Sequence, residues 1–325
     1  MSTHRVKRQD LILALFVLFS SEYDKQPHES ILDIFIPIDQ VKAFLENRFG
    51  VSYSGCSWIL TQIRNYEEEI GYRLFEKVPA SGDDYGLKLC HSMIAFNQKR
   101  HLYITQKIKV SNALYDMITH LTEINPMKGR PEETIRLLID AGSMVYHLAD
   151  IIAGHSCYSP LNYEIYTHNI AVIQRFLEPH VDLSRITLHT PRGRIDPITY
   201  SILGENTALY ENVDFDMVIQ GVSFLYDGEI WVEHPGESGI KADILRETRG
   251  LKVLILTGHE VRSEPPLESH PPFGQLADFD RLVIPHNAEG KIKNLNKMLE
   301  QHGNLLEPEI MNWNYKIYKI IKQPG

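Results

Sequence analysis

The sequence predicts two domains: a small helical domain with a β-hairpin at the N-terminus, and a larger α/β domain with a parallel sheet behind it. Apolar residues recur at three- and four-residue steps through most of the first 125 residues. From residue 134 onward, short apolar strands alternate with helices. Pro126, Gly129 and Pro131 mark a linker between the two patterns. At 325 residues the chain is long enough for two hydrophobic cores.

Composition places the chain among ordinary globular proteins, with 43% apolar and 23% charged residues. Residues 1–125 carry 14 Lys and Arg against 15 Asp and Glu, a balance of −1, and the remaining residues carry 19 against 27, a balance of −8. The N-terminal part therefore lacks the strongly basic character typical of nucleic-acid binding. Cys56, Cys90 and Cys157 show no metal-ligand spacing, so we expect free thiols and a cytoplasmic location.

The N-terminal elements follow from apolar spacing and from residues that end helices. The apolar run 11–19 is too short to span a bilayer and no cleavage site follows it, so 8–21 is expected to be a buried helix and no membrane partner is expected. A second helix over 38–49 ends at Gly50, and Ser54 is a candidate N-cap for a third helix that runs to Ile70. Helix, short turn and helix is the helix-turn-helix pattern.

Strands are expected over 72–77 and 85–90, joined through a Gly- and Asp-containing tip, which completes a wing. The segment Gln62–Lys77, QIRNYEEEIGYRLFEK, resembles the corresponding segment of LysR-type winged helix-turn-helix regulators. The resemblance covers about residues 36–120 and implies that double-stranded DNA is the partner; a DeoR-type reader fits the same region loosely. By position, the residues expected to contact DNA are Ser54, Ser57, Trp58, Thr61, Gln62 and Arg64. Trp58 is either a core residue or a stacking contact, and a winged helix used for protein contacts is the alternative for the whole domain.

A longer helix is expected over 91–121, at the place of the LysR linker helix, which implies a homodimer or homotetramer. Its apolar stripe consists of Ile104, Ile108, Leu114, Met117, Ile118 and Leu121. Such a stripe must be buried against something, and pairing between two copies would bury it.

The later part of the chain, residues 134–286, resembles the sensor domain of DeoR-type regulators, which shares an isomerase-like, Rossmannoid fold with ribose-5-phosphate isomerase. The landmarks, in order, are Ile139–Ser143, Tyr166–Asn169, Ser201–Gly204, Asp216–Gly221, Glu237–Lys241 and Phe273–Asp280. Strand-end turns of this kind place Gly, Ser and Thr at helix N-termini, where free amides hold anions. The residues expected to bind an effector are Asp140, Gly142, Ser143, Thr167, Asn169, Arg192 and Lys241.

The chain departs from the DeoR pattern in ways that alter the phosphosugar site. Thr257-Gly258-His259-Glu260 stands where the family has an Asp and a Lys, and His189-Thr190-Pro191-Arg192-Gly193 replaces a paired-glycine site. His189, Arg192 and His259 are candidates to rebuild an anion site. The histidines show no metal spacing and no catalytic triad can be assembled, so neither a metal, a cofactor nor an enzyme is expected.

The sequence thus predicts a winged helix-turn-helix domain over 1–90, a linker and dimerisation helix over 91–130, a DeoR-like effector-sensing domain over 131–290 and a tail over 291–325. The predicted function is DNA-binding transcription regulation controlled by a small-molecule effector, such as a phosphorylated sugar. Two alternatives remain: a diverged sugar-phosphate isomerase-like enzyme, and a protein-interaction module with a degenerate pocket.

Overall fold

The computed structural model describes residues 6–25, 31, 34–53, 55–70, 73–80, 84–90, 96–124, 134–197, 199–204, 208–265, 271–286 and 293–322. The chain divides into two compact units, which we call the N-terminal unit (1–104) and the α/β unit (105–325). Within the described ranges, no helix combines the length and the apolar character that crossing a membrane requires.

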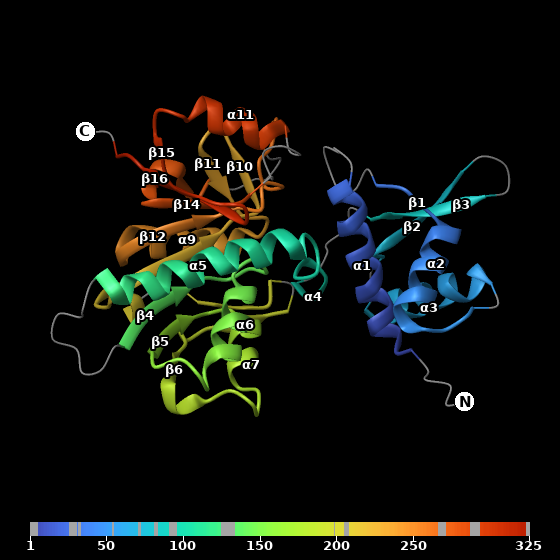
Figure 1. The fold of residues 1–325 in the computed structure, drawn as a ribbon, viewed down its shortest axis with the longest axis horizontal. Helices are drawn as coiled ribbons and strands as arrows, with labels where there is room; N and C mark the ends of the chain where they lie inside the picture. Colours follow the sequence, from blue (N-terminus) through green and yellow to red (C-terminus); the bar gives the residue numbers. More distant parts are fainter. Residues whose placement is uncertain are drawn as a thin grey trace. The chain divides into compact units, whose positions relative to one another are not determined.

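The N-terminal unit combines helices with a three-stranded antiparallel sheet (Figure 1). Along the chain its elements are α1 (Arg8–Lys25), β1 (Ile36–Pro37), α2 (Ile38–Phe49), α3 (Cys56–Ile70), β2 (Phe75–Pro79), β3 (Tyr85–Leu89) and α4 (Phe96–Lys99). The strand order is β1-β3-β2, so β2 lies at one edge. Phe16 and Phe19 of α1 pack on Phe75 of β2, with ring centroids 5.3 and 5.9 Å apart. Gly50 ends α2 in the left-handed conformation (φ 63°) that glycine adopts without a Cβ clash, as the sequence predicts.

The α/β unit is built on one eight-stranded sheet, in the order β15-β16-β14-β12-β9-β4-β5-β6. Its strands are β4 (Thr134–Ile139), β5 (Asn162–Thr167), β6 (Ile186–His189), β9 (Asp214–Gly221), β12 (Arg249–Ile255), β14 (Arg281–Pro285), β15 (Leu306–Met311) and β16 (Tyr315–Ile320). The six from β14 to β6 run parallel, and β16 is antiparallel to both of its neighbours. The predicted α/β class with a mostly parallel sheet is confirmed.

Shorter strands lie outside the main sheet. They are β7 (Arg194–Asp196) and β8 (Ser201–Leu203), which form a hairpin, and β10 (Phe224–Tyr226), β11 (Glu229–Trp231) and β13 (Gly274–Gln275), which form a small antiparallel sheet. Neither set is predicted from the sequence, because three-residue strands carry too little periodicity to be recognised.

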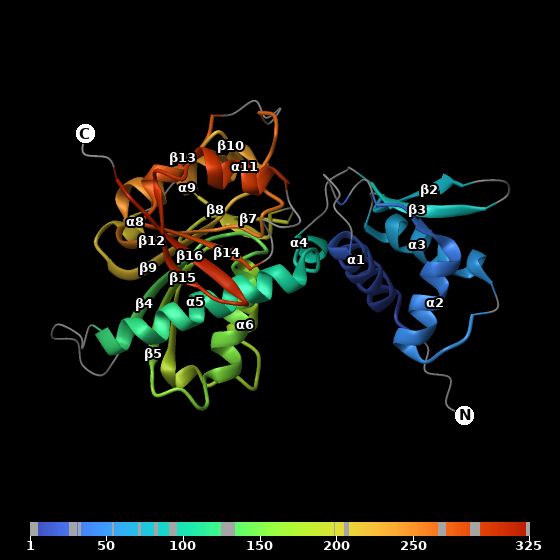
Figure 2. The ribbon, with the colours of Figure 1, turned by 45° about the horizontal axis from the view of Figure 1, so that its top comes forward.

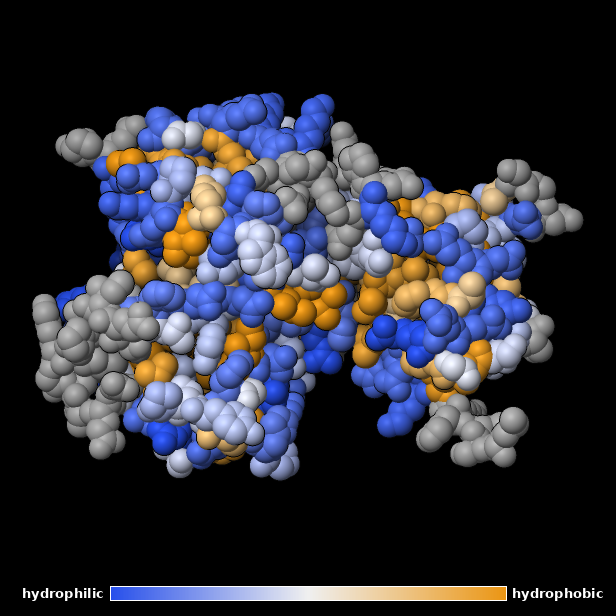
Figure 3. All heavy atoms as spheres, in the orientation of Figure 1, coloured by the Kyte–Doolittle hydropathy of each residue, from blue (hydrophilic) through white to orange (hydrophobic). Residues whose placement is uncertain are grey.

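Helices cover both faces of the main sheet, as Figure 2 shows. The helices are α5 (Ile104–Ile124), α6 (Tyr146–His155), α7 (Ile170–Phe176), α8 (Ala208–Glu211), α9 (Pro235–Glu247) and α11 (Lys293–Gln301). Leu137 of β4 belongs to the core formed with α5, α6 and α7, while the next residue, Leu138, belongs to the core formed with α8 and α9 on the other face. On α11, Leu295 and Met298 are buried against the sheet and the outward face is hydrophilic (Figure 3).

The first strand of the sheet, β4, lies at a topological switch point. It pairs with β5 on one side and with β9 on the other, and the later strands continue outward from these two neighbours. In open α/β sheets, ligands bind beyond the carboxyl ends of the strands at such a point. The turn that follows β4 therefore occupies the place where this fold is best suited to hold a small molecule.

The predicted helix over 91–121 is wrong in its first part. Within the described residues, α4 ends at Lys99 and α5 begins at Ile104, because Tyr103 takes a left-handed conformation (φ 54°) and its amide donates to Ser20 Oγ at 2.8 Å. Leu114, Met117 and Ile118 of the predicted stripe pack on the α/β unit's own core, whereas Ile108 is 42% exposed. These three residues need no second copy to cover them, and the dimer remains a prediction.

Candidate functional site at the carboxyl edge of the sheet

Three strand ends bring polar side chains together at one edge of the sheet. The groups lie at the ends of β4, β5 and β12, and two helices, α5 and α9, each add one lysine. We call this set the carboxyl-edge cluster; it contains Lys107, Asp140, Gly142, Ser143, Thr167, His168, Asn169, Lys241, Thr257, His259 and Glu260. Most of these side chains are buried, so their contacts with one another determine what the edge can bind.

The turn after β4 is held in place by Asn169, which follows β5. The side-chain oxygen of Asn169 accepts the amides of Ala171 and Val172 and caps α7, and its Nδ2 donates to Gly142 O at 3.0 Å. Gly142 has φ +117°, a conformation that L side chains rarely adopt, and no atom lies where its Cβ would be. The sequence therefore needs Gly at 142 and Asn at 169 to bring the two strand ends together.

Asp140 and Lys241 form a buried ion pair at the centre of the cluster. Lys241 Nζ donates to Asp140 Oδ2, to Gly221 O at 3.1 Å and to Ala141 O at 3.3 Å. Asp140 is 0% exposed, and its Oδ1 accepts the Ala141 amide at 2.8 Å. Burial alone would raise the pKa of Asp140, but the Lys241 ammonium and His168 together lower it. All three protons of Lys241 are thus used inside the protein.

Three buried polar atoms near this pair have no hydrogen-bond partner among the described residues. They are His168 Nδ1, Tyr210 OH and Gln220 Oε1. His168 Nε2 lies 3.2 Å from Asp140 Oδ1. Burial, and then the charge of Asp140, raise the pKa of Tyr210, so its phenol stays protonated. These atoms make this side of the cluster polar, but its two charged groups, Asp140 and Lys241, are already paired with each other.

The second half of the cluster lies toward α5. Lys107 is 4% exposed, and its Nζ donates to Ser143 Oγ at 3.0 Å. Burial, followed by the charges of Lys107 and Arg262, lowers the pKa of His259 well below 6.5, so its imidazole is neutral at physiological pH. The three groups place an ammonium, a hydroxyl and a neutral imidazole at the switch point.

Glu260 is the carboxyl group of this half. Its Oε2 accepts the amides of Thr257 and Gly258, each at 2.9 Å, and its Oε1 accepts Thr257 Oγ1 at 2.7 Å. Burial raises the pKa of Glu260, and the hydrogen bonds and Lys107 offset only part of this effect. A buried carboxyl group with a raised pKa beside a neutral imidazole is the kind of pair that acid–base chemistry uses.

The structure brings together six of the seven residues predicted to bind an effector. Asp140, Gly142, Ser143, Thr167, Asn169 and Lys241 lie in the carboxyl-edge cluster. Arg192 instead is exposed in the connection before β7, where its carbonyl lies against Gly204. The prediction missed Lys107, which stands three, four and seven residues before the buried Val110, Ser111 and Leu114. That spacing places Lys107 on the inward face of α5 and could have revealed it.

The residues predicted to contact DNA lie on or beside α3 in the N-terminal unit. Ser54 lies outside the described residues. Thr61 Oγ1 donates to Ser57 O at 3.0 Å, Gln62 Oε1 accepts Arg8 Nε at 3.4 Å, and Trp58 stacks on Tyr53 with centroids 4.7 Å apart. Ser57 and Arg64 are exposed. Helix α3 has one arginine and three glutamates, which sum to −2.

A metal site was not predicted, and in the described part of the chain no three His, Cys, Asp or Glu side chains lie together so as to hold an ion. No protein-family model and no curated protein matches the chain.

Solved structures similar to the chain include ribose-5-phosphate isomerases, eIF2B beta and carbon methyltransferases. Ribose 5-phosphate isomerase from Plasmodium falciparum is 10% identical, with a TM-score of 0.32 over 67% of this chain and 80% of that one. Ribose-5-phosphate isomerase A from Neisseria gonorrhoeae is 9% identical, with a TM-score of 0.30 over 68% and 76%. The eIF2B beta structure from Chaetomium thermophilum is 10% identical, with a TM-score of 0.33 over 90% and 86%.

The prediction of a DNA-binding transcription regulator controlled by an effector is wrong. The solved structures similar to the chain include isomerases, eIF2B beta and carbon methyltransferases, and none of these is a DNA-binding regulator by name. The physical reason lies in α3, whose net negative charge opposes the phosphate backbone that a DNA-reading helix must approach. The motif Gln62–Lys77 indicates a helix and a strand, and these are present, but the motif does not by itself establish what they bind.

Proposed function

We propose that the α/β unit is a diverged sugar-phosphate isomerase-like enzyme whose substrate binds at the carboxyl-edge cluster. The observation that carries this proposal is the Lys107–Ser143 contact at the switch point, beside a buried carboxyl group, Glu260, with a raised pKa. Isomerisation of a sugar phosphate needs a cationic site for the phosphate and an acid–base group near the carbonyl carbon. Both kinds of group are present here.

The phosphate would bind to Lys107 and to the turn that contains Gly142 and Ser143. A glycine turn at the end of a parallel strand lets the backbone approach an anion closely, and a buried ammonium adds charge where the local dielectric is low. Ser143 is partly exposed and is already a hydrogen-bond partner of Lys107 Nζ, so the two groups can turn together toward a phosphate oxygen.

Proton transfer would be carried out by Glu260, with His259 polarising the carbonyl. An imidazole that burial keeps neutral can donate a hydrogen bond to a developing enediolate. Glu260 would take the proton from the carbon next to the carbonyl and return it to the carbonyl carbon, while the proton of the neighbouring hydroxyl passes through His259 to the former carbonyl oxygen. The substrate must displace part of the Thr257–Glu260 turn, because the carboxyl oxygens of Glu260 accept three hydrogen bonds within it.

The test uses the full chain with five- and six-carbon sugar phosphates. A ligand present at 100 times its dissociation constant should add about 2.7 kcal/mol to the unfolding free energy, visible as a thermal shift. Proton NMR in deuterated water should show exchange of the hydrogen next to the carbonyl. Lys107→Met should abolish the thermal shift, whereas Lys109→Met on the same helix should leave it unchanged. Glu260→Gln should keep the shift and stop the exchange.

A second candidate is a binding domain without turnover, and the Asp140–Lys241 pair favours it. Lys241 donates its three protons to acceptors within the protein. This half of the cluster therefore offers no unpaired ammonium to a substrate. In that case sugar phosphates raise the melting temperature, but no hydrogen exchanges with solvent. If no sugar phosphate changes the melting temperature, or if Lys107→Met and Lys109→Met reduce the shift equally, the proposed site is wrong.

We also propose that the N-terminal unit is a winged helix. The order helix, strand, helix, helix, strand, strand and the β2–β3 hairpin support this assignment. Solution NMR of the full chain would contradict it if the contacts between β1 and β3 were missing.

A further inference from the structure

The turn that follows β12 directs three hydrogen-bond donors at one carboxylate. The amides of Thr257 and Gly258 each donate to Glu260 Oε2 at 2.9 Å, and the hydroxyl of Thr257 donates to Glu260 Oε1 at 2.7 Å. Gly258 has a φ of +98°, and left-handed residues are typical of the concave turns in which successive amides face one anion. The turn thus has the geometry of an anion site, and Glu260 supplies the anion.

The backbone of this turn is held without the side chain of Glu260. Leu225 of β10 donates its amide to Glu260 O, and the carbonyl of Leu225 accepts the Arg262 amide, each at 2.9 Å. Val261, which is 4% exposed, packs in the core beneath β10 and β11. The carboxyl group can therefore leave the three donors while the backbone that carries them stays in place.

Burial destabilises the carboxylate that occupies the donors. Glu260 is 9% exposed, and burial raises its pKa, while its hydrogen bonds and the charge of Lys107 offset only part of this effect. A carboxyl group that gains a proton accepts hydrogen bonds less strongly than a carboxylate does. A ligand that is fully ionised at neutral pH can therefore compete with Glu260 for these donors.

Two cations favour a negative charge at the turn. After burial, the charges of Lys107 and Arg262 lower the pKa of His259, so both cations act on this turn. Lys107 is 4% exposed, whereas Arg262 is exposed and its guanidinium lies over the ring of Phe224, 4.9 Å from the centroid. Within the described ranges, this guanidinium has Phe224 but no carboxylate as a partner. An arginine that stacks on an aromatic ring can still direct its N–H groups at an anion.

A buried hydroxyl without a partner lies on the same side of α5 as Lys107. Ser111 follows Lys107 by one helical turn and is 0% exposed, and its Oγ has no hydrogen-bond partner among the described residues. Buried hydroxyl groups are normally hydrogen-bonded. The inward side of α5 therefore offers one more hydrogen bond to a ligand that binds beside Lys107.

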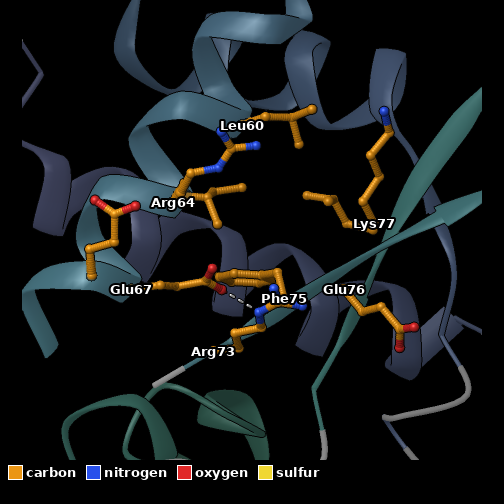
Figure 4. Close-up of a pocket in the computed structure, with 10 residues that line it drawn as sticks. Leu60, Arg64, Glu67, Arg73, Phe75, Glu76 and Lys77 are labelled. Atoms are coloured by element: carbon orange, nitrogen blue, oxygen red, sulfur yellow. Dashed lines mark hydrogen bonds between the residues drawn. The ribbon is translucent and has the colours of Figure 1, made fainter. Parts of the chain in front are cut away.

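The groove of the N-terminal unit shows no such preference for one sign of charge. It lies between α3 and β2, has a volume of about 680 Å³ and is lined by as many acids as cations (Figure 4). Its charged residues are Arg64, Glu67, Glu68, Arg73, Glu76 and Lys77. A mixed lining does not select a ligand by its charge, whereas every group that the turn after β12 directs at Glu260 is a donor.

We propose that the turn after β12 is a binding site for the oxyanion of a small-molecule ligand, a phosphate or carboxylate group, and that the carboxylate of Glu260 takes its place in this structure. The donors are the two amides and the hydroxyl of Thr257 and Gly258, and Lys107 supplies the opposite charge. The site concerns binding alone and does not depend on turnover. In the proposed isomerisation, release of Glu260 from the turn would also free the carboxyl group that acts as the base.

The test follows the backbone amide signals of Thr257 and Gly258 by NMR of the isotopically labelled full chain. The chain is titrated with inorganic phosphate, acetate or chloride at equal ionic strength. Phosphate or acetate is expected to shift both signals to saturation in the wild-type chain, and chloride is not. The anion that saturates at the lower concentration identifies the group that the ligand carries. Glu260→Ala should bind that anion at least about tenfold more tightly, because the carboxylate of Glu260 no longer competes.

Further variants locate the binding. In the Glu260→Ala background, Thr257→Val removes the hydroxyl and keeps the size of the side chain, so it should weaken the anion by about tenfold or more. Glu264→Ala is the matched control: it removes an exposed carboxylate from the same segment and should leave the wild-type affinity within about twofold. Circular dichroism melting checks that each variant is folded. If Glu260→Ala is not, Glu260→Gln keeps the shape without the charge, and it should also bind the anion more tightly than the wild type.

The proposal is overturned if neither anion shifts the two amides in the wild-type chain, even where Glu260→Ala binds one, because Glu260 is then a fixed part of the turn. Equal affinity of the wild type and Glu260→Ala, or equal shifts with chloride, would also contradict it. Failure of the proposed function looks different: no sugar phosphate exchanges hydrogen with solvent, although an anion shifts these amides. Hydrogen exchange without any shift of these amides by the anions would leave the proposed function and remove this site.

Discussion

Replacing Lys241 with methionine is the most direct test of how the carboxyl-edge cluster is held together. The substitution keeps the length and apolar stem of the side chain but leaves the Asp140 carboxylate, which is 0% exposed, without its ammonium partner. Removing one member of a buried ion pair costs about 3–5 kcal/mol, because the remaining charge is buried and uncompensated. Against a typical unfolding free energy of about 5–15 kcal/mol, such a loss is a large fraction of the stability of the α/β unit.

The pKa of Asp140 predicts the direction in which the stability of each protein changes with pH. In the wild-type protein the pKa of Asp140 lies below its ordinary value of 3.8, so the pair contributes stability above that value and loses it as pH falls through the folded pKa. In Lys241→Met, burial is expected to dominate and to raise the folded pKa of Asp140 above the unfolded one. The variant should then regain stability as the pH falls from 7 through that raised pKa. The difference between the two proteins should shrink toward acid.

Urea unfolding followed by tryptophan fluorescence measures the loss. Trp231 is buried in the α/β unit and reports on it, and Trp58→Phe in both proteins removes the signal from the N-terminal unit. The double variant Asp140→Asn, Lys241→Met should be more stable at pH 7 than Lys241→Met alone, because it removes the uncompensated charge.

A loss below about 1 kcal/mol in Lys241→Met would refute this reasoning, since a pair that matters so little must be solvated or absent. A stability difference that stays constant from pH 7 to pH 4 would refute the assignment of the loss to Asp140. Comparing variants at each pH cancels the titration of the groups that they share.

Three further predictions test other parts of the α/β unit. His259 has a folded pKa well below 6.5, so the stability that its neutral form provides is present above pH 6.5 and is lost as pH falls toward the folded pKa; His259→Gln should flatten this part of a stability profile measured by urea unfolding. Gly250→Ala should destabilise by more than about 1 kcal/mol, because its φ is +128° and a Cβ would lie 2.4 Å from a backbone oxygen, whereas the helical Gly154→Ala has open space and should stabilise by about 0.5–1 kcal/mol in the same assay. Tyr315→Phe removes a 2.7 Å hydrogen bond from Tyr315 OH to Asp116 on α5 and should lower the free energy of unfolding by about 1 kcal/mol, measured by calorimetry; no change would mean that water replaces this bond.

The parallel strands could be predicted because each is a short apolar run that ends at a turn. Strand β4 ends at Asp140-Ala141-Gly142 and β9 at Gly221, and both stand out from the sequence. Which strands lie next to each other could not be predicted, because this depends on contacts between residues that are distant in the sequence. The Arg136 amide, for example, donates to Asp216 Oδ2 at 2.8 Å across 80 positions of the chain.

The end of the sheet was not predicted for a different reason. Strand β15, Leu306–Met311, includes Glu307, Pro308 and Glu309, and proline and glutamate are poor strand formers. These residues are tolerated because β15 is an edge strand, where proline is allowed and charge prevents further pairing. Composition therefore predicts a tail, whereas pairing with β16 makes a strand.

Most residues of the site were predicted from the sequence, but not which of them pair with each other. Asp140 and Lys241 look like ligand-binding groups in the sequence, because an acid and a lysine at two turns at one sheet edge are what a polar ligand would need. In the structure they neutralise each other, and Lys241 has no proton left to donate outward. Lys107 is not among the residues predicted to bind an effector, yet it is buried and donates to Ser143 Oγ. We therefore propose that the anion binds on the side of α5 rather than α9. For this reason the proposed substrate is placed against Lys107, and the Asp140–Lys241 pair is assigned the role of fixing the turn that Lys107 faces.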